Sequence, residues 1–337
     1  MQMILEKMDE FFNSRLEGYE GHQLNAIEGA KEFYPFTASL LPMHRCAKVL
    51  DLGCGTGLEL GYYFELNPSA KVTGIDIAVD MLKVLKEKFT DKAVTVIQGS
   101  YFDVPFEKNY YDAVVSVGSL HHFTKEGKVS LYKKVFKALV NGGYYILTDY
   151  FSKTEDDEVY FRNELLRLKT EQGISDNEFY HFDTPLTVEH EIEALKEAGF
   201  THITKLKQWG ATCTIKAVKK IIMIHKMNLA PSPFSAISSG RKTIEMRIYD
   251  EKRSKIKVGD EIEFDNIDTH QTIKCKVINL TRYKDFFELY SNFDKTVLGY
   301  SENETANAED MYTYYSPEQI EKYGVLAIEI KLIKDNS

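Results

Sequence analysis

The chain has 337 residues, a hydrophobic fraction of 43% and a formal net charge of −9. This length is enough for two ordinary domains, and so large a hydrophobic fraction excludes an intrinsically disordered chain. No run of about 18 apolar residues occurs and the start MQMILEKMDEFF carries early acids, so we expect neither a membrane span nor a signal peptide. The four cysteines, Cys46, Cys54, Cys213 and Cys275, form no CxxC pair. We therefore expect no disulfide framework and no metal site, and a reducing, cytoplasmic location.

The first forty residues are rich in aromatic side chains and include Tyr19 and Tyr34. We interpret residues 1–40 as a segment that covers a substrate, with these two tyrosines as candidate substrate contacts. Packing of the aromatic rings in the core is the alternative interpretation.

A short apolar run, Val49 to Leu52, predicts a buried strand. Gly53, Gly55 and Gly57 follow it in a GxGxG turn, and an amphipathic helical pattern comes next. Glycines at a strand-to-helix turn allow the backbone to approach a ligand closely. On its own, such a loop indicates only a nucleotide-binding type of sheet.

Further strands alternate with helices along the first half of the chain. About twenty residues after the glycines, KVTGIDIAVDML gives a second strand that ends at Asp76, whose carboxylate suits two ribose hydroxyls. We predict three more strands within 93–106, 111–123 and 141–151, and helices over 79–89 and 125–140. This alternation predicts a doubly wound α/β sheet that binds its ligand at the carboxyl ends of the strands.

Two histidines follow the fourth strand in the sequence VGSLHHF, and His121 is our candidate for a general base or a substrate contact. A histidine that only packs or caps is the alternative. Residues 152–185 hold an acidic helix and the sequence EFYHFDTP, and we interpret them as a second covering segment that disfavours a polyanion.

The sequence VLDLGCGTG resembles the first motif of the class I S-adenosylmethionine-dependent methyltransferases, and the resemblance extends over residues 1–218. It implies a Rossmann-like sheet of seven strands, with a late helix in 186–200 and the last strands near 201–208 and 211–217. It also implies S-adenosyl-L-methionine as cofactor. Asp51 and the loop would approach its amino-acid part, Asp76 its ribose, and Ser100 or Asp103 its adenine. The implied cofactor-binding residues are Asp51, Gly53, Cys54, Gly55, Gly57, Asp76, Ile77, Ser100, Tyr101 and Val117.

Residues 219–337 have a different character, with several short strands and few helices in sequences such as IIMIHKMNL, TIEMRIY and VLAIEIKLI. This pattern predicts a small β-barrel. Residues 219–257 contain ten basic and three acidic residues, the one basic block of an acidic chain. The block indicates either a solvated face or a site for an anion such as phosphate.

Gly240, Lys242, Glu245 and Arg247 form the pattern G-x-K-x-x-E-x-R inside this block. With KVGDEIEF and YGVLAIEI, the pattern resembles the ASCH domain, a relative of the PUA-type barrels, over about 221–334. The resemblance implies that Lys242, Glu245 and Arg247 bind RNA, a nucleotide or a modified nucleoside. A structural Glu–Arg pair is the alternative. Some ASCH-like proteins hydrolyse acetylated cytidine with a Lys and a Thr, and Glu245 stands here in place of that Thr.

Taken together, the sequence predicts a methyltransferase with an ASCH module, and a small-molecule acceptor is favoured over a macromolecule. Methylation of RNA or a nucleoside delivered by the ASCH domain is the first alternative. An inactive, cofactor-sensing RNA-binding protein is the second.

Overall fold

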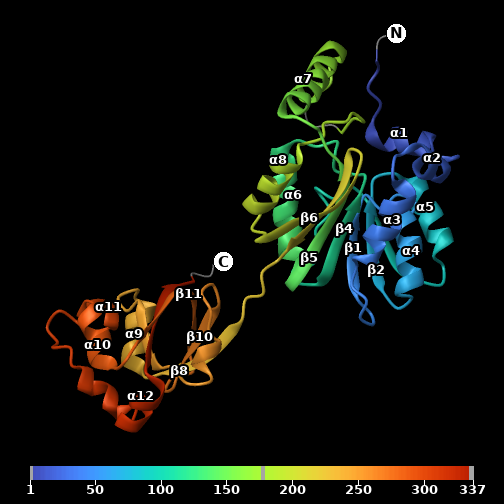
Figure 1. Ribbon diagram of the computed structural model, residues 1–337. Coiled ribbons are helices and arrows are strands. Elements are labelled where there is room, and N and C mark those ends of the chain that lie inside the picture. The colour runs from blue at the N-terminus through green and yellow to red at the C-terminus, as the bar shows by residue number, and fades with distance from the viewer. Residues whose placement is uncertain (1–2, 176–178, 334–337) are drawn as a thin grey trace. The chain divides into compact units, whose positions relative to one another are not determined.

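The computed structural model describes residues 3–175 and 179–333, and it divides into two compact units, 1–221 and 222–337. The predicted segments 1–40, 152–185 and 219–337 each include a few residues that lie outside the described ones, namely 1–2, 176–178 and 334–337. Figure 1 shows the ribbon of each unit. Within the described ranges no helix is long and apolar enough to cross a membrane.

The first unit is built on a seven-stranded sheet with the order β3-β2-β1-β4-β5-β7-β6. All neighbouring strands are parallel except β7, which runs antiparallel to both β5 and β6. The strands are β1 (Lys48–Leu52), β2 (Lys71–Asp76), β3 (Ala93–Gln98), β4 (Tyr111–Val117), β5 (Leu139–Tyr150), β6 (His202–Trp209) and β7 (Thr212–Val218). This sheet confirms the predicted fold class of the first half of the chain.

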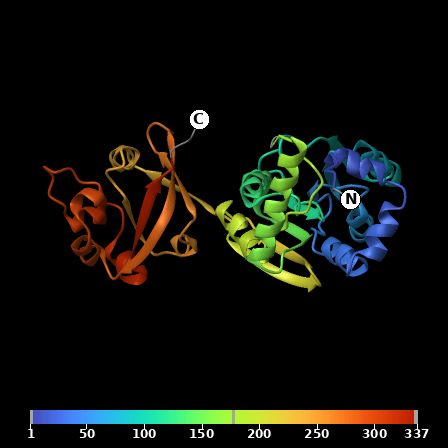
Figure 2. The same cartoon turned by 90° about the horizontal axis from the view of Figure 1, so that it is seen from above.

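Helices cover both faces of this sheet, so its central strands are buried on both sides (Figures 1 and 2). This burial explains why the consecutive residues Val49 to Leu52 of β1 are all buried, rather than every second residue. One face carries α3 (Ala30–Ser39), α4 (Leu58–Leu66) and α5 (Val79–Lys88), and the other carries α6 (Lys125–Ala138) and α8 (Val188–Glu197).

Three further helices lie beside the ends of the strands: α1 (Met8–Ser14), α2 (Tyr19–Ala26) and α7 (Glu155–Gln172). A threonine caps the helices α6, α7 and α8, because its hydroxyl accepts a backbone N–H of the first turn. These caps are Thr124 for α6, Thr154 for α7 and Thr187 for α8. Each cap fixes the residue at which its helix begins.

The second unit has a five-stranded sheet with the order β8-β10-β11-β12-β9, in which only the β8–β10 pair is parallel. Apolar side chains pack on both faces of this sheet. The elements are β8 (Ile224–Leu229), α9 (Pro231–Ser238), β9 (Ile244–Ile248), β10 (Glu261–Asn266), β11 (Thr272–Tyr283), α10 (Phe286–Asn292), α11 (Lys295–Leu298), α12 (Pro317–Tyr323) and β12 (Val325–Leu332), with short 3-10 helices at Arg253–Lys255 and Ala308–Thr313.

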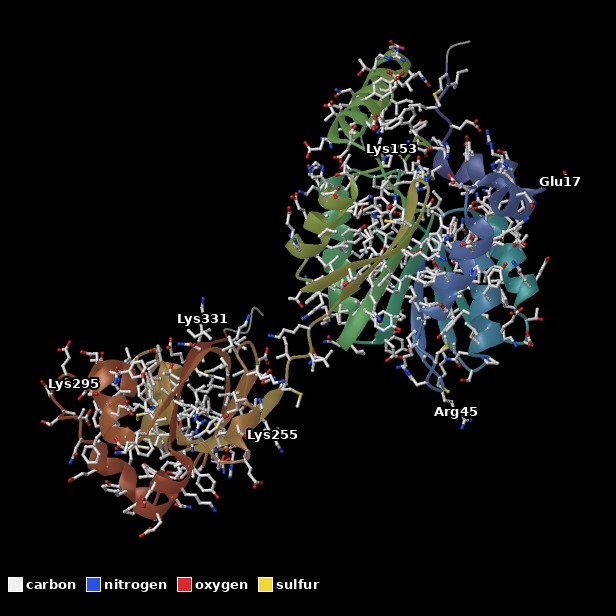
Figure 3. All side chains as sticks on the ribbon, in the orientation of Figure 1. Glu17, Arg45, Lys153, Lys255, Lys295 and Lys331 are labelled. Atoms are coloured by element: carbon white, nitrogen blue, oxygen red, sulfur yellow. The ribbon has the colours of Figure 1, made fainter. Side chains whose placement is uncertain are left out.

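Charged side chains in both units lie mainly at the surface (Figure 3). Glu17 and Arg45 are exposed in the first unit, and Lys255 and Lys331 are exposed in the second. The buried charges are therefore informative, since a charge is held inside a protein only by a specific partner.

Candidate functional site

Two adjoining pockets open at the carboxyl ends of β1, β2, β4 and β5. The first, which we call the cofactor pocket, has an empty volume of about 630 Å³. Its lining includes the predicted residues Gly53, Gly55, Asp76, Ile77, Ser100, Tyr101 and Val117, together with Tyr19.

The glycine loop forms one wall of the cofactor pocket. Gly55 has a φ of +49° and a Cβ added there would meet no atom within 4 Å, so the backbone faces open space. Gly53 has a φ of +73°, and a Cβ there would lie 2.0 Å from the Ser119 hydroxyl oxygen. The loop thus needs glycine for its left-handed backbone, and at Gly55 it leaves room for a ligand.

Asp76 lies at the end of β2 and fixes the loop. One of its carboxylate oxygens accepts the Gly55 N–H and the other accepts the Ala78 N–H, each at 2.8 Å. Each oxygen keeps a further lone pair, so Asp76 can also accept hydrogen bonds from a ligand in the pocket that it lines.

Two more carboxyl groups lie beneath the loop. Asp51 is fully buried, and burial together with the neighbouring Glu59 raises the pKa of Asp51 well above its usual value. Burial also raises the pKa of Glu59 and of Asp76. A cationic ligand beside the loop would favour the ionised form of these acids, which agrees with the ammonium and sulfonium groups of S-adenosylmethionine.

Not every predicted cofactor residue lines the pocket. The Cys54 side chain is buried beneath the sheet end, where a Cβ at Gly74 would meet its Sγ at 2.7 Å. A Cβ at Gly57 would contact Phe89. Asp51, Cys54 and Gly57 therefore support the loop from below, whereas the other predicted cofactor residues reach the pocket.

Segments from both ends of the first unit close these pockets; we call α1, α2 and residues 179–183 the cover. The Met8 N–H donates to the Phe179 carbonyl at 3.0 Å, and Phe11 stacks on His181. Glu20 attaches α2 to the glycine loop, because its carboxylate accepts Thr56 Oγ1–H at 2.6 Å and Lys88 at 2.5 Å. The cover is thus tied to the loop that forms the cofactor pocket.

The second pocket, which we call the acceptor pocket, shares Phe12, Tyr19, Gly118 and His122 with the first. The predicted residues His121, Tyr19 and Tyr34 all line it. Tyr34 is only 5% exposed and also belongs to the apolar core. Its position is therefore compatible both with a substrate contact and with packing in the core.

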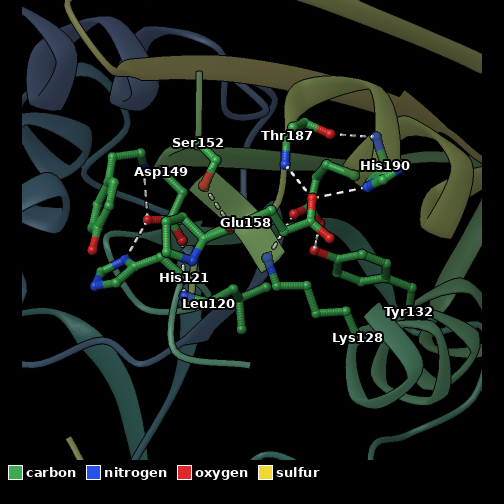
Figure 4. A network of polar contacts seen from close by, with 12 residues as sticks. Leu120, His121, Lys128, Tyr132, Asp149, Ser152, Glu158, Thr187 and His190 are labelled. Carbon is green, nitrogen blue, oxygen red and sulfur yellow. Dashed lines mark hydrogen bonds and ion pairs between the residues drawn. The ribbon is translucent and has the colours of Figure 1, made fainter. Parts of the chain in front are cut away.

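His121 is held by a buried carboxylate (Figure 4). Asp149 at the end of β5 lies 2.6 Å from His121 Nδ1 and also accepts the Leu120 N–H at 2.8 Å. Burial alone would raise the pKa of Asp149, but His121 and Lys128 outweigh it and lower that pKa, so the group is ionised. An ionised Asp149 accepts the proton of Nδ1, which leaves the Nε2 lone pair of His121 available in the pocket.

Asp183 and His122 lie beside His121. Asp183 Oδ1 is 3.5 Å from His121 Nε2 and 3.1 Å from His122 Nδ1. Burial and the neighbouring His121 lower the pKa of His122 to about 4, so this imidazole is neutral at pH 7. The Thr184 N–H donates to the His121 carbonyl at 2.8 Å, which holds the Asp183 segment against the histidines.

Sequence reasoning missed Asp149, Asp183 and Glu20. Asp149 follows the rule that ligand-binding residues gather at the carboxyl ends of parallel strands, so its place in LTDYF was a usable signal. Asp183 stands 62 positions after His121, and only the folded cover brings the two together.

A third pocket, in the second unit, contains Lys242, Glu245 and Arg247. Lys242 Nζ lies 3.4 Å from Glu245 Oε2, and Arg247 Nε lies 2.7 Å from Glu245 Oε1. Lys242 also donates to the Leu298 carbonyl at 3.0 Å, and Arg247 to the Asn228 carbonyl at 3.0 Å. The three charges form one buried group rather than an open basic surface.

Tyrosines and acids complete this third pocket. The tyrosines are Tyr290, Tyr300, Tyr314 and Tyr315, and the acids are Glu304 and Asp310. Elsewhere in the basic block, Lys226 pairs with Glu263 at 3.2 Å and Arg253 with Asp250 at 2.5 Å. Aromatic rings beside mixed charges suit a flat heterocycle with polar edges better than a phosphate chain.

Comparison with protein families agrees with both halves of the chain. Residues 49–143 match a family described as a methyltransferase domain, and residues 227–334 match the ASCH domain. These matches confirm the two resemblances on which the sequence interpretation rested.

Relatives with named activities are similar to parts of the chain. A demethylmenaquinone methyltransferase of Lactococcus lactis is 28% identical over 261 residues, which are 70% of this chain and 95% of that protein. A tRNA (carboxymethyluridine(34)-5-O)-methyltransferase of Arabidopsis thaliana is 32% identical over 112 residues, 32% of this chain but only 25% of that protein. The solved structure of the S-adenosylmethionine-dependent methyltransferase SibL matches with a TM-score of 0.44 and 18% identity, over 63% of this chain and 59% of SibL.

Proposed function

Because the chain contains an S-adenosylmethionine-dependent methyltransferase domain and an ASCH domain, we propose that it methylates a small molecule bound in the acceptor pocket. The cofactor supplies an electrophilic methyl group on a sulfonium, so the protein has mainly to bind, orient and, where needed, deprotonate the acceptor. The observation that carries the proposal is the position of His121 and Asp149 in a covered pocket that adjoins the cofactor pocket.

The cover supports a small acceptor. Phe12 and Tyr19 stand over both pockets, and α2 is bound to the glycine loop through Glu20. A nucleotide inside an RNA strand would have to pass between these segments with its phosphates. The first turn of α7 carries a run of acids, including Glu155, Asp156 and Asp157, and this negative charge in the first unit disfavours a polyanion.

His121 is the group that we assign to deprotonation of the acceptor. With Asp149 holding Nδ1, the Nε2 atom is free to accept a proton from an acceptor hydroxyl, and Asp149 stabilises the imidazolium that forms. Two of the similar proteins are named for a small-molecule and for a tRNA acceptor, so both acceptor classes need to be tested.

The decisive experiment uses methyl-tritiated S-adenosylmethionine with an extract of the source cells, afterwards separated into small-molecule, RNA and protein fractions. We expect label in the small-molecule fraction, and we expect replacement of His121 by Gln to reduce it about 100-fold or more. Label confined to RNA would refute the small-molecule assignment. Cofactor binding without label in any fraction would instead support the inactive, cofactor-sensing alternative.

A second function belongs to the ASCH domain: we infer that the third pocket binds a base of RNA or a free nucleotide. The pocket offers tyrosine rings for stacking, Arg247 as a donor and Glu245 as an acceptor for base edges. Because the charges are largely matched, we expect affinity that depends only weakly on salt.

Fluorescein-labelled single-stranded RNA of mixed sequence and the four ribonucleoside monophosphates are suitable probes for this function. Arg247→Gln should weaken binding of the RNA about tenfold, since one donor to the base edge is lost. Arg253→Gln is the matched control, because Arg253 lies in the same basic block but pairs with Asp250 outside the pocket. If Arg247→Gln and Arg253→Gln weakened RNA binding equally, the third pocket would not be the binding site, and the basic block would be an ordinary charged surface.

A further inference from the structure

His121, His122 and Asp183 converge on one point of the acceptor pocket. A single atom, Asp183 Oδ1, lies 3.1 Å from His122 Nδ1 and 3.5 Å from His121 Nε2. The three ligand atoms all lie within 4.8 Å of one another. Metal–ligand bonds of about 2.0–2.2 Å at octahedral or tetrahedral angles place neighbouring donor atoms roughly 3.0–3.5 Å apart. Both distances from the carboxylate therefore suit a shared metal ion, and a small inward shift of one imidazole completes the set.

The surroundings of His121 are those of a metal ligand. Asp149 accepts the Nδ1 proton at 2.6 Å and is itself fixed by the Leu120 N–H. A carboxylate that accepts the Nδ1 proton fixes the tautomer and leaves Nε2 free to bind a metal. Histidine ligands of metals commonly have such a carboxylate partner. The backbone contact between Thr184 and His121 keeps Asp183 in place on the other side.

Asp183 also has an unused acceptor. Its Oδ1 atom is buried, although the Asp183 side chain as a whole is 44% exposed, and neither nearby imidazole donates a well-aligned hydrogen bond to this oxygen. His122 Nδ1 lies 3.3 Å from the Phe182 carbonyl oxygen, a long contact that loss of the Nδ1 proton would release. A buried carboxylate oxygen without a hydrogen bond is costly unless it has a further partner, and a cation is such a partner.

We propose that His121, His122 and Asp183 bind a divalent first-row transition-metal ion at the junction of the two pockets. Two imidazoles and one carboxylate form the ligand set typical of ions such as Fe²⁺, Mn²⁺ or Zn²⁺ that keep open coordination positions. All three residues line the acceptor pocket and His122 also lines the cofactor pocket, so the open positions face both.

A bound ion would narrow the class of acceptor beyond a small molecule in general; this inference about the acceptor rests on the proposed function. Open positions beside a pocket suit an acceptor that offers oxygen donors, such as a hydroxyl next to a carbonyl. Coordination lowers the pKa of a bound hydroxyl, whose proton then passes to solvent. His121 would in that case act by holding the ion instead of accepting the proton itself.

Metal binding can be tested without any acceptor. Untagged protein is stripped with EDTA, dialysed and titrated with Co²⁺, whose visible absorption reports coordination by the protein. We expect one Co²⁺ per chain, displaced by Zn²⁺, and we expect Asp183→Asn to weaken binding at least tenfold. Asp149→Asn should also weaken it by about 10- to 100-fold, as the partner of a metal-ligating histidine.

His181→Gln is the matched control, because His181 lines the same pocket and stacks on Phe11 but is not one of the three ligands. It should bind Co²⁺ as the unmodified protein does. Absence of stoichiometric binding, or equal binding by Asp183→Asn, would overturn the inference. If the protein bound no Co²⁺ but His121→Gln still abolished transfer of the labelled methyl group, the metal site would be refuted and the proposed function would be supported.

Discussion

Ion pairs join α6 to α8 at a buried lysine, Lys128, and at a more exposed one, Lys125, which pairs with both Glu193 and Glu197. Lys128 and Glu191 lie 2.6 Å apart with side chains that are 2% and 0% exposed, and the Tyr132 hydroxyl also donates to Glu191. Lys125 and Glu193 lie 2.7 Å apart, but their side chains are 25% and 54% exposed. The same pair of helices thus offers a buried test and a matched surface control.

We expect Glu191→Gln to lower the free energy of unfolding of the first unit by about 3–5 kcal/mol, because it leaves the buried Lys128 ammonium without its ion-pair partner. With a urea slope of about 2 kcal/mol/M, this corresponds to a midpoint lower by roughly 1.5–2.5 M. Glu193→Gln should move the midpoint far less, since water already screens that pair. The double variant Lys128→Met, Glu191→Leu should recover most of the loss, because no unpaired charge remains.

Trp209 makes the measurement specific to the first unit. It is the one tryptophan of the sequence, it is 8% exposed, and it packs against Phe33 and Phe36. Its fluorescence in a urea titration therefore follows unfolding of this unit alone. A midpoint for Glu191→Gln equal to that of Glu193→Gln, or no recovery in the double variant, would refute the reasoning from buried charge.

Three further outcomes follow from the site. Asp76→Ala should weaken binding of S-adenosylhomocysteine by about tenfold or more in calorimetry, because the carboxylate both fixes the loop and lines the pocket. Asp80→Asn is the control and should leave this affinity unchanged, because the Asp80 side chain pairs with Lys83. An unchanged affinity of the Asp76 variant would mean that the ribose binds elsewhere. Asp149→Asn should lower kcat for the identified acceptor about 100-fold while leaving S-adenosylhomocysteine affinity within twofold, and a fall in both would indicate a structural role instead. Glu20→Gln should hasten tryptic cleavage after the exposed Arg15, since the cover loses the carboxylate that accepts hydrogen bonds from Thr56 and Lys88. Equal rates of digestion for the variant and the unmodified protein would show that this carboxylate does not hold the cover in place.

The sequence predicted what depends on local pattern. The order of strands and helices from Val49 to Val218 followed from apolar runs separated by glycine-containing turns. Strand β2 ends at Asp76 as predicted, and β1 and α5 each differ from prediction by one residue at one end. Antiparallel β7 was not predicted from the pattern itself, because the direction of a strand depends on the length and path of its connection rather than on its side chains. Helix α10 was missed because its seven residues are too few to show a helical period.

Prediction of the site rested mainly on residues at the ends of strands, although Tyr19 and Tyr34 on the helices also line the acceptor pocket. Gly55, Asp76 and His121 each follow a strand, and the ends of parallel strands meet at one edge. Asp183 and Phe179 come from a connection whose path is set by pairing with the N-terminal segment, as in the bridge of Lys7 to Tyr180. Cysteine spacing, on which the expectation of no metal site relied, carries no information about a cluster of two histidines and an aspartate.

The wall that the two pockets share has a kinetic consequence. Phe12 and Tyr19 belong to the cover and touch both spaces, so a ligand in either pocket restrains the same two rings. Restraint of a common wall couples the two affinities, and thermodynamic linkage requires the factor to be the same in both directions. Cofactor and acceptor would then bind synergistically, and the two products would leave in a preferred order, with departure of the first releasing the second.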